Sequence, residues 1–179
     1  EVLGKDWNPL DLKFKTEKQY HDDLVKILNS DTVREIRISK DNNPFEMEDE
    51  IYALEEPENN IHIAKDKLTL SQIGSSMNIC VGSYGNYCEN GNCRIIYFIE
   101  NNQPVACLEL QRRGKTEDKK DYKYALTQAK LRGNELVGYN HNMHSKVVAW
   151  CERHNVEIDT PDMLLREEEK AVEAELMHF

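Results

Sequence analysis

Two apolar segments joined by a short polar turn constrain the fold more than any other part of the chain. Residues 94–100 are apolar on both faces, which is typical of a central strand, and Asn-Asn-Gln at 101–103 forms a turn. The chain returns over 104–111, so these two segments are expected to form a β-hairpin. A charged linker leads to a third apolar segment, 122–131, which is closed by Gly133. Together the three segments predict an antiparallel β-meander.

Helical periodicity surrounds these strands. A capping box at Thr16 begins an amphipathic segment over 16–29, and another at Thr69 begins one over 70–81 that Gly82 is expected to end. Further helices are expected over 84–90, closed by Gly91, over 145–154, capped by Ser145, and over 160–177, with Pro161 at the favoured first position.

The order of these segments indicates one domain of the α+β class, in which an antiparallel β-meander packs against helices. The length of 179 residues also suits a single domain. Three parts are expected: an N-terminal arm and helix over 1–30, an α+β core over 31–158 and an acidic C-terminal helix over 159–179. Within the core, a short half-buried strand around 33–38 precedes an acidic, turn-rich loop over 40–60.

Apolar runs and cysteine usage bear on location. The longest apolar run, 95–99, is far shorter than the roughly 20 residues of a membrane-spanning helix, so no membrane partner is expected. The five cysteines are odd in number, and Cys107 lies inside a predicted core strand, which disfavours a disulfide framework and favours the cytoplasm. The chain opens at Glu1 rather than at a methionine, so the lack of a recognisable signal peptide says little about the full gene product.

Charge is unevenly distributed. The chain has 23 basic and 33 acidic side chains, a formal net charge of −10, yet residues 112–132 hold eight basic and three acidic ones. A positive segment on an acidic protein is a candidate phosphate-binding surface, with Tyr122 and Tyr124 available for base stacking. The alternative is a solvated hairpin loop whose lysines protect sheet edges. The nucleic-acid-binding candidates, called the basic strip below, are Arg112, Arg113, Lys119, Lys120, Lys123, Lys130 and Arg132.

Polar residues on the predicted strands form a second candidate site. Strand phase places Glu109 and Gln128 near each other on the sheet, facing a pocket beneath helix 70–81 that Tyr84 and Asn134 also line. If these groups are buried they must be hydrogen-bonded, and such groups either fix a core or line a site.

Cys80 is a candidate nucleophile. A thiolate site is conceivable with His141 or His144 as the base, although the C-terminal end of a helix raises a thiol pKa. The alternative is a small buried hydrophobe beside Met77 and Val81. Candidate catalytic residues are therefore Cys80, Glu109 and Gln128, and none of them is assigned a role.

Metal and cofactor motifs are lacking in the sequence. The cysteines and histidines of the chain do not show the tight Cys-x2-Cys or His-x3-His spacing of structural zinc sites, so no metal is expected. No phosphate-binding loop, Rossmann fingerprint, HExxH or G-x-S-x-G occurs, so no cofactor is expected either. The soft ligands considered are Cys88, Cys93, His141, His144, Cys151 and His154.

The segment LSQIGSSMNICVGSY at 70–84 resembles the signature of the PcfJ-like family of conjugative plasmids and other mobile elements, roughly L-x-x-E-G-x-x-L-x-H-C-V-G-x-Y. The resemblance covers about half of the chain: it continues through strand 95–99, the segment ACLEL at 106–110 and the segment QAKLRGN at 128–134, and it closes on helix 145–154. Two positions depart from the pattern, since Ile73 replaces an acidic residue and Ile79 replaces the histidine before cysteine. The matching positions are Leu70, Gly74, Met77, Cys80, Val81, Gly82 and Tyr84.

The resemblance implies a context of plasmid transfer and DNA processing rather than a settled reaction. The leading hypothesis is an accessory protein of a mobile element that binds nucleic acid or a protein partner. The first alternative is an enzyme acting on nucleic acid or nucleotide, with its site around Cys80, Tyr84, Glu109 and Gln128. The second is a purely protein-binding module that docks through the acidic C-terminal helix.

Overall fold

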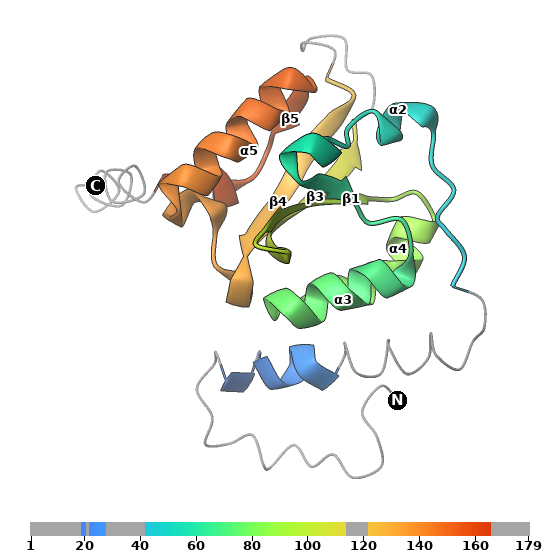
Figure 1. Ribbon diagram of the computed structural model, residues 1–179, viewed down its shortest axis with the longest axis vertical. Helices are drawn as coiled ribbons and strands as arrows, with labels where there is room; N and C mark the ends of the chain where they lie inside the picture. Colours follow the sequence, from blue (N-terminus) through green and yellow to red (C-terminus); the bar gives the residue numbers. More distant parts are fainter. Residues whose placement is uncertain (1–18, 21, 28–41, 114–121, 166–179) are drawn as a thin grey trace, which may run out of the picture.

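A computed structural model describes residues 19–20, 22–27, 42–113 and 122–165 (Figure 1). Within this part of the chain, five strands form one sheet in the order β1-β2-β3-β4-β5. Neighbours β1 to β4 are antiparallel, and β5 lies parallel to β4. The predicted α+β class and its meander of β2, β3 and β4 are confirmed. The strands are β1 Ile61–Ile63, β2 Arg94–Glu100, β3 Gln103–Arg112, β4 Tyr124–Leu131 and β5 Val156–Ile158.

The β2–β3 hairpin depends on two consecutive asparagines. Asn101 and Asn102 have φ angles of 50° and 60°, and Glu100 pairs with Gln103 across the turn. Two left-handed residues match the right-handed twist of the flanking strands, and asparagine tolerates this conformation better than most residues. The predicted turn is confirmed at Asn101 and Asn102, whereas Gln103, expected in the turn, is the first residue of β3.

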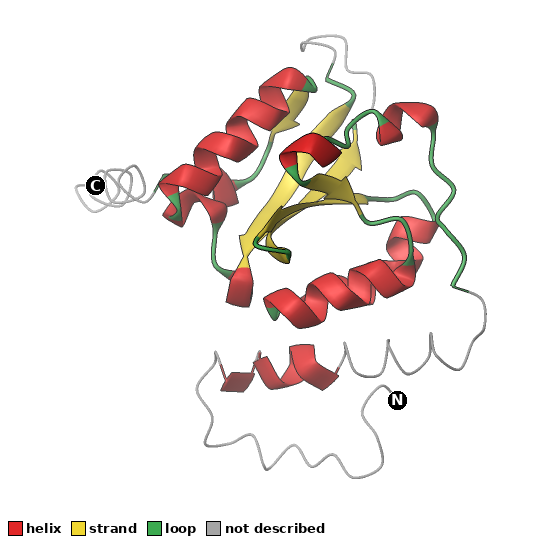
Figure 2. Cartoon of the chain, in the orientation of Figure 1, coloured by secondary structure: helices red, strands yellow, loops and turns green. Residues whose placement is uncertain are grey.

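Helices cover both faces of the sheet (Figure 2). In Figure 1, α3 and α4 lie on one side and α5 lies on the other, where it connects β4 to the parallel strand β5. Residues 19–20 and 22–27 are also helical, in agreement with the predicted helix over 16–29. Further α-helices are α2 Asp49–Tyr52, α3 Lys67–Met77, α4 Gly85–Glu89 and α5 His141–Arg153. The 3-10 helices of the described ranges are η2 Pro57–Asn59, η3 Cys80–Tyr84, η4 Arg132–Asn134, η5 Val137–Tyr139 and η6 Pro161–Met163.

Two apolar cores follow from the alternation of side chains along the strands. On the α5 face, Ile96, Leu108 and Leu126 pack with Trp150. On the α3 face, Ile95 and Cys107 pack with helix residues such as Leu70 and Met77. Strand β2 is thus buried on both sides, as its apolar sequence predicts. No helix in the described ranges has the length and apolarity needed to cross a membrane.

Helix α3 begins and ends earlier than the predicted 70–81. Its N-cap is Asp66, whose carboxylate accepts a hydrogen bond from the Thr69 amide at 2.7 Å, so the capping box predicted at Thr69 is wrong. It ends at Met77 because Asn78 is left-handed, with a φ of 56°. Cys80 therefore begins the separate 3-10 helix η3 and does not lie on the α-helix.

Helix α5 also begins earlier than predicted. Its N-cap is Asn140, which accepts a hydrogen bond from the Met143 amide at 3.0 Å. Ser145 lies inside the helix, where its hydroxyl donates to the His141 carbonyl at 2.9 Å, so the predicted Ser145 cap is wrong. Asn140, three residues before the apolar Met143, therefore caps the helix.

The predicted helix over 160–177 does not begin at Thr160. The Thr160 hydroxyl instead caps the single 3-10 turn Pro161–Met163, after which Leu164 is extended. The remainder of that prediction, at 166–179, lies outside the described residues, as do the arm at 1–15, the capping box at Thr16 and the strand around 33–38. The boundaries at 30 and 158 stay a prediction.

Candidate functional site

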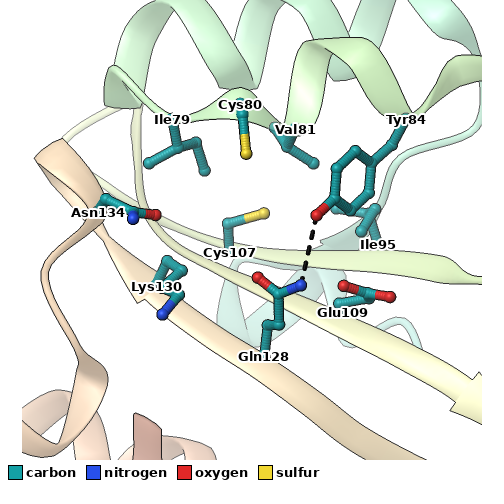
Figure 3. Close-up of a pocket in the computed structure, with 10 residues that line it drawn as sticks. All are labelled: Ile79, Cys80, Val81, Tyr84, Ile95, Cys107, Glu109, Gln128, Lys130 and Asn134. Carbon is teal, nitrogen blue, oxygen red and sulfur yellow. Dashed lines mark hydrogen bonds between the residues drawn. The ribbon is translucent and has the colours of Figure 1, made fainter. Parts of the chain in front are cut away.

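A hollow of about 300 Å³, including its open mouth, lies between η3 and the sheet (Figure 3). It collects side chains from η3 and the residue before it, and from β2, β3, β4 and η4. The walls are mainly apolar, and polar atoms from β3 and β4 form part of the lining. The lining residues are Ile79, Cys80, Val81, Tyr84, Ile95, Cys107, Glu109, Gln128, Lys130 and Asn134.

Strand register creates the polar floor of the hollow. Glu109 of β3 lies between Ile95 of β2 and Gln128 of β4, and Cys107 pairs with Lys130. Residues two apart on a strand share a face, so these side chains all point toward η3. The structure thus brings together the residues Cys80, Tyr84, Glu109, Gln128 and Asn134 that the sequence analysis singled out.

Glu109 is a buried carboxylate, with 5% of its surface exposed. One oxygen, Oε1, accepts a hydrogen bond from Gln111 Nε2 at 2.9 Å. No basic side chain among the described residues lies within ion-pairing distance of it. Burying a carboxylate without a cationic partner is costly, and the cost falls when a ligand supplies hydrogen-bond donors. Glu109 therefore gives the hollow a strong preference for a group that donates hydrogen bonds.

Gln128 and Tyr84 form the second polar contact of the hollow. Gln128 Nε2 lies 3.3 Å from the Tyr84 hydroxyl, which points toward it from η3 (Figure 3). Burial, with smaller contributions from Cys80 and Glu109, raises the pKa of Tyr84 to about 12, so its hydroxyl stays protonated at neutral pH. Gln128 uses one of its two amide N–H groups in this bond and keeps its carbonyl oxygen as an acceptor.

Lys130 is held by the C-terminal segment of the described chain. Its Nζ donates to Asp162 Oδ1 at 2.8 Å, while Asp162 Oδ2 accepts from the Ala129 amide at 2.9 Å. Thr160 in turn accepts from the Asp162 amide at 3.2 Å. Asp162 is 6% exposed and lies beside β4 beyond the end of β5. Its side chain there accepts the Ala129 amide hydrogen bond, as the backbone of a neighbouring strand would. The sequence analysis did not single out Asp162. The signal for it was its place in the capping sequence Thr-Pro-Asp at 160–162.

Among the residues that the structure describes, no histidine lines the hollow beside its two cysteines. Cys80 is half-buried at the start of η3, and Cys107 is buried in β3, where desolvation raises the pKa of its thiol. His141 and His144 belong to α5, which covers the opposite face of the sheet, and neither lines the hollow. The lining therefore lacks the nucleophile–base pair that thiol catalysis requires.

Most described members of the basic strip are ion-paired. Arg112 donates to Glu48 at 3.0 Å, and Lys123 contacts Glu50. Arg132 is exposed, and no carboxylate of a described residue lies within ion-pairing distance of it. Lys119 and Lys120 lie outside the described residues. The remaining members are Arg113, which pairs with Glu157 at 2.7 Å and with Asp159, and Lys130, which pairs with Asp162 at 2.8 Å.

The soft ligands considered for a metal are separated in the structure. Cys88 of α4 and Cys93, the residue before β2, have their sulfurs 3.1 Å apart, whereas Cys151 is a buried residue of α5 on the other face of the sheet. His154 lies 2.8 Å from a Glu56 oxygen that Arg153 also contacts. In the ranges that the structure describes, no three histidine, cysteine or acidic side chains gather as metal ligands.

Comparisons with protein-family models, with curated proteins and with solved structures return no match to this chain.

Proposed function

We propose that this chain is a cytoplasmic, PcfJ-like accessory protein of a mobile genetic element, and that its hollow binds one unpaired base of a nucleic acid. The observation that carries the proposal is the buried carboxylate of Glu109, which has Gln111 as its described hydrogen-bond donor and faces an open hollow. The PcfJ-like signature supplies the nucleic-acid context.

Two hydrogen-bond acceptors lie side by side on the polar floor. Glu109 and the carbonyl oxygen of Gln128 both accept hydrogen bonds, and they are neighbours in the β3–β4 register. Exocyclic amino groups of cytosine and adenine donate such bonds, whereas thymine and uracil present carbonyls at the same edge. Apolar walls from Ile79 and Val81 suit the faces of a base. The hollow is therefore expected to prefer cytosine and adenine.

Its size limits the occupant to a small group. The enclosed part of this hollow measures only about 20 Å³, room for about one water molecule, whereas pockets for small molecules enclose roughly 300 to 1,000 Å³. It therefore admits one small group, such as the exocyclic amino group at the edge of a base in a single strand, because a base inside a duplex is stacked and paired. We therefore expect single strands to bind more tightly than duplexes.

Arg132 is the cation best placed to contact the phosphate beside that base. It follows β4 directly, Asn134 of the same turn lines the hollow, and its guanidinium is exposed. Arg113, by contrast, is engaged by Glu157 and Asp159. The logarithm of the binding constant falls linearly with the logarithm of the salt concentration. Replacing Arg132 with glutamine should make this slope shallower by about 0.7, the value for one lost phosphate contact to a single strand. The Arg113→Gln substitution should leave the slope nearly unchanged.

Fluorescence anisotropy with labelled single-stranded oligo-dC, oligo-dA and oligo-dT tests the proposal. The decisive variant is Glu109→Gln, with Glu58→Gln as its matched control, because Glu58 is exposed and distant in sequence. Both changes remove one negative charge, which by itself strengthens attraction to phosphate. The proposal predicts that Glu109→Gln weakens oligo-dC binding by about tenfold and reduces its preference over oligo-dT. Glu58→Gln should not weaken it.

Two outcomes would contradict the proposal. One is equal behaviour of the Glu109→Gln and Glu58→Gln variants, provided that circular dichroism shows both to be folded. The other is failure of the wild-type protein to bind any oligonucleotide at low salt. Failure of this second kind favours the alternative of a purely protein-binding module.

A further inference from the structure

Two buried thiols lie in contact at the junction of α4 and β2. The Sγ atoms of Cys88 and Cys93 are 3.1 Å apart, and each residue is 1% exposed. Four residues separate them in the sequence. A disulfide bond is about 2.05 Å long, so these sulfurs need to approach by only about 1 Å to be joined. Neither cysteine lines the candidate site.

The backbone holds this pair together independently of any sulfur bond. Gly91 adopts a φ of 75°, and its amide donates to the Cys88 carbonyl at 3.0 Å. Arg94 Nη1 donates to the carbonyls of both cysteines, at 2.7 Å to Cys88 and 3.0 Å to Cys93. The loop is therefore already closed by hydrogen bonds before oxidation, and the ordering that a disulfide usually has to impose is largely complete.

We propose that Cys88 and Cys93 are a thiol pair that forms an intramolecular disulfide by exchange with a low-molecular-weight disulfide such as oxidised glutathione. This inference does not depend on the proposed function of the hollow. In the first step, one cysteine thiolate attacks the glutathione disulfide, forming a mixed disulfide and releasing one glutathione thiolate. In the second, the other cysteine thiolate attacks the protein sulfur of the mixed disulfide, closing the protein disulfide and releasing the second glutathione thiolate.

The electron and proton balance closes within these reactants. Two cysteine thiols are oxidised to one disulfide, and one glutathione disulfide is reduced to two thiols. The two cysteine protons end on the two glutathione thiolates. The hydrogen bond with Cys88, followed by burial, raises the pKa of the Cys93 thiol. Exchange therefore proceeds slowly in the folded protein, because a raised pKa leaves little thiolate and burial restricts access.

Equilibration in glutathione buffers tests the preformed geometry. The full chain is incubated, folded or in urea, at a series of ratios of oxidised to reduced glutathione, starting from both the reduced and the oxidised protein. After quenching with an alkylating agent, peptide mass mapping measures the fraction joined between Cys88 and Cys93, about 2 Da lighter than the dithiol. At one buffer composition, the ratio of disulfide to dithiol should be at least about tenfold higher in the folded chain than in urea.

Cysteine variants identify which residues form the disulfide. Cys88→Ser and Cys93→Ser should each abolish the linked peptide, whereas Cys80→Ser should leave it unchanged. A folded-state ratio equal to or lower than the ratio in urea would overturn the proposal, because it would show that the fold does not favour the bond. So would a dominant linkage of either residue to Cys80 or Cys107. The folded wild-type protein supplies the central result, so the proposal does not depend on any variant being stable.

Discussion

Single polar groups buried in this protein differ in how well their hydrogen bonds are satisfied. The Glu56 carboxylate accepts hydrogen bonds from Asn59 at 2.7 Å and from two nitrogens of Arg153 at 2.9 and 2.7 Å. The hydroxyl of Ser71, fully buried in α3, has no hydrogen-bond partner in the described residues. These two groups should respond to removal in opposite directions, because an unsatisfied buried group destabilises the fold and a satisfied one stabilises it.

Ser71→Ala should stabilise the protein. It removes an unpartnered hydroxyl from the core and replaces serine with a better helix former, so the free energy of unfolding should rise by about 1 kcal/mol. Chemical denaturation measures this change. Ser75→Ala, at an exposed position of the same helix, isolates the helix propensity and should have a smaller effect. A destabilised Ser71→Ala protein would show that the hydroxyl has a partner.

Glu56 should make stability depend on acid pH. The Arg153 hydrogen bond is the main cause that lowers the pKa of Glu56 from 4.5 to about 2. A carboxylate with a lowered pKa stabilises the fold above its unfolded pKa, and this stabilisation is lost as the pH falls from about 4.5 to about 2. Glu56→Gln should therefore lower the free energy of unfolding by roughly 2 kcal/mol at pH 7 and much less near pH 2.

A pH series of urea denaturations checks this difference, with Glu58→Gln as the exposed control. The difference in free energy of unfolding between the wild type and Glu56→Gln should shrink toward acid pH. A difference that stays constant would contradict the lowered pKa of Glu56.

At the scale of elements, the C-terminal segment stabilises β4 where β5 ends. Gly138 of η5 lies so close to this segment that an added Cβ would be 1.8 Å from the Leu164 carbonyl oxygen. The contact lets Asp162 reach both Ala129 and Lys130. The position of Lys130 in the hollow therefore depends on a glycine in a different element.

Gly138→Ala should displace residues 160–165 from β4. The loss of the Asp162 hydrogen bonds should lower the free energy of unfolding by more than about 2 kcal/mol, measured by thermal or chemical denaturation. Gly133→Ala is the control: no atom lies within 4 Å of its added Cβ, so it should cost only about 1 kcal/mol for its positive φ. Equal costs for the two variants would refute the close contact.

The same scale shows which elements the sequence predicts and which it does not. Strand β2 and its Asn-Asn turn were predictable, because an uninterrupted apolar run at 95–99 followed by two consecutive asparagines is a clear pattern in the sequence. Strands β1 and β5 have three residues each, too few to show a period, and pair only through tertiary contacts. Helix ends were mispredicted where two capping residues compete, as Asp66 does with Thr69.

For the site, strand phase was sufficient to place Glu109 beside Gln128, because residues on facing strands alternate in a regular way. The hydrogen bond between Lys130 and Asp162 joins residues 32 positions apart and has no local signal. Charge counting likewise suggested a free basic strip, whereas Arg112 and Arg113 are paired with carboxylates from distant segments. A charge count of a segment gives the number of charged side chains but not the distant residues with which they form ion pairs.

At the scale of the whole molecule, the sheet separates two regions of different character. Each face carries an apolar core, and the α3 face also carries the hollow, where Asn78 ends the helix early and η3 covers β3 and β4. Glu109 and Gln128 of its lining lie on β3 and β4, inside the five-stranded sheet. A binding site built on such strands is preorganised for its ligand.

The location of nucleic-acid binding is the central claim, and a two-dimensional NMR titration with single-stranded oligo-dC tests it most directly. The account predicts that the largest shift changes occur at the backbone amides of Glu109, Gln128 and Ala129 and at the side-chain amides of Gln128 and Asn134. The same titration of the Gln128→Ala variant should give much smaller chemical shift changes at the residues that line the hollow. Shift changes confined to residues 112–123 or to α5, with the lining of the hollow unaffected at saturation, would contradict it.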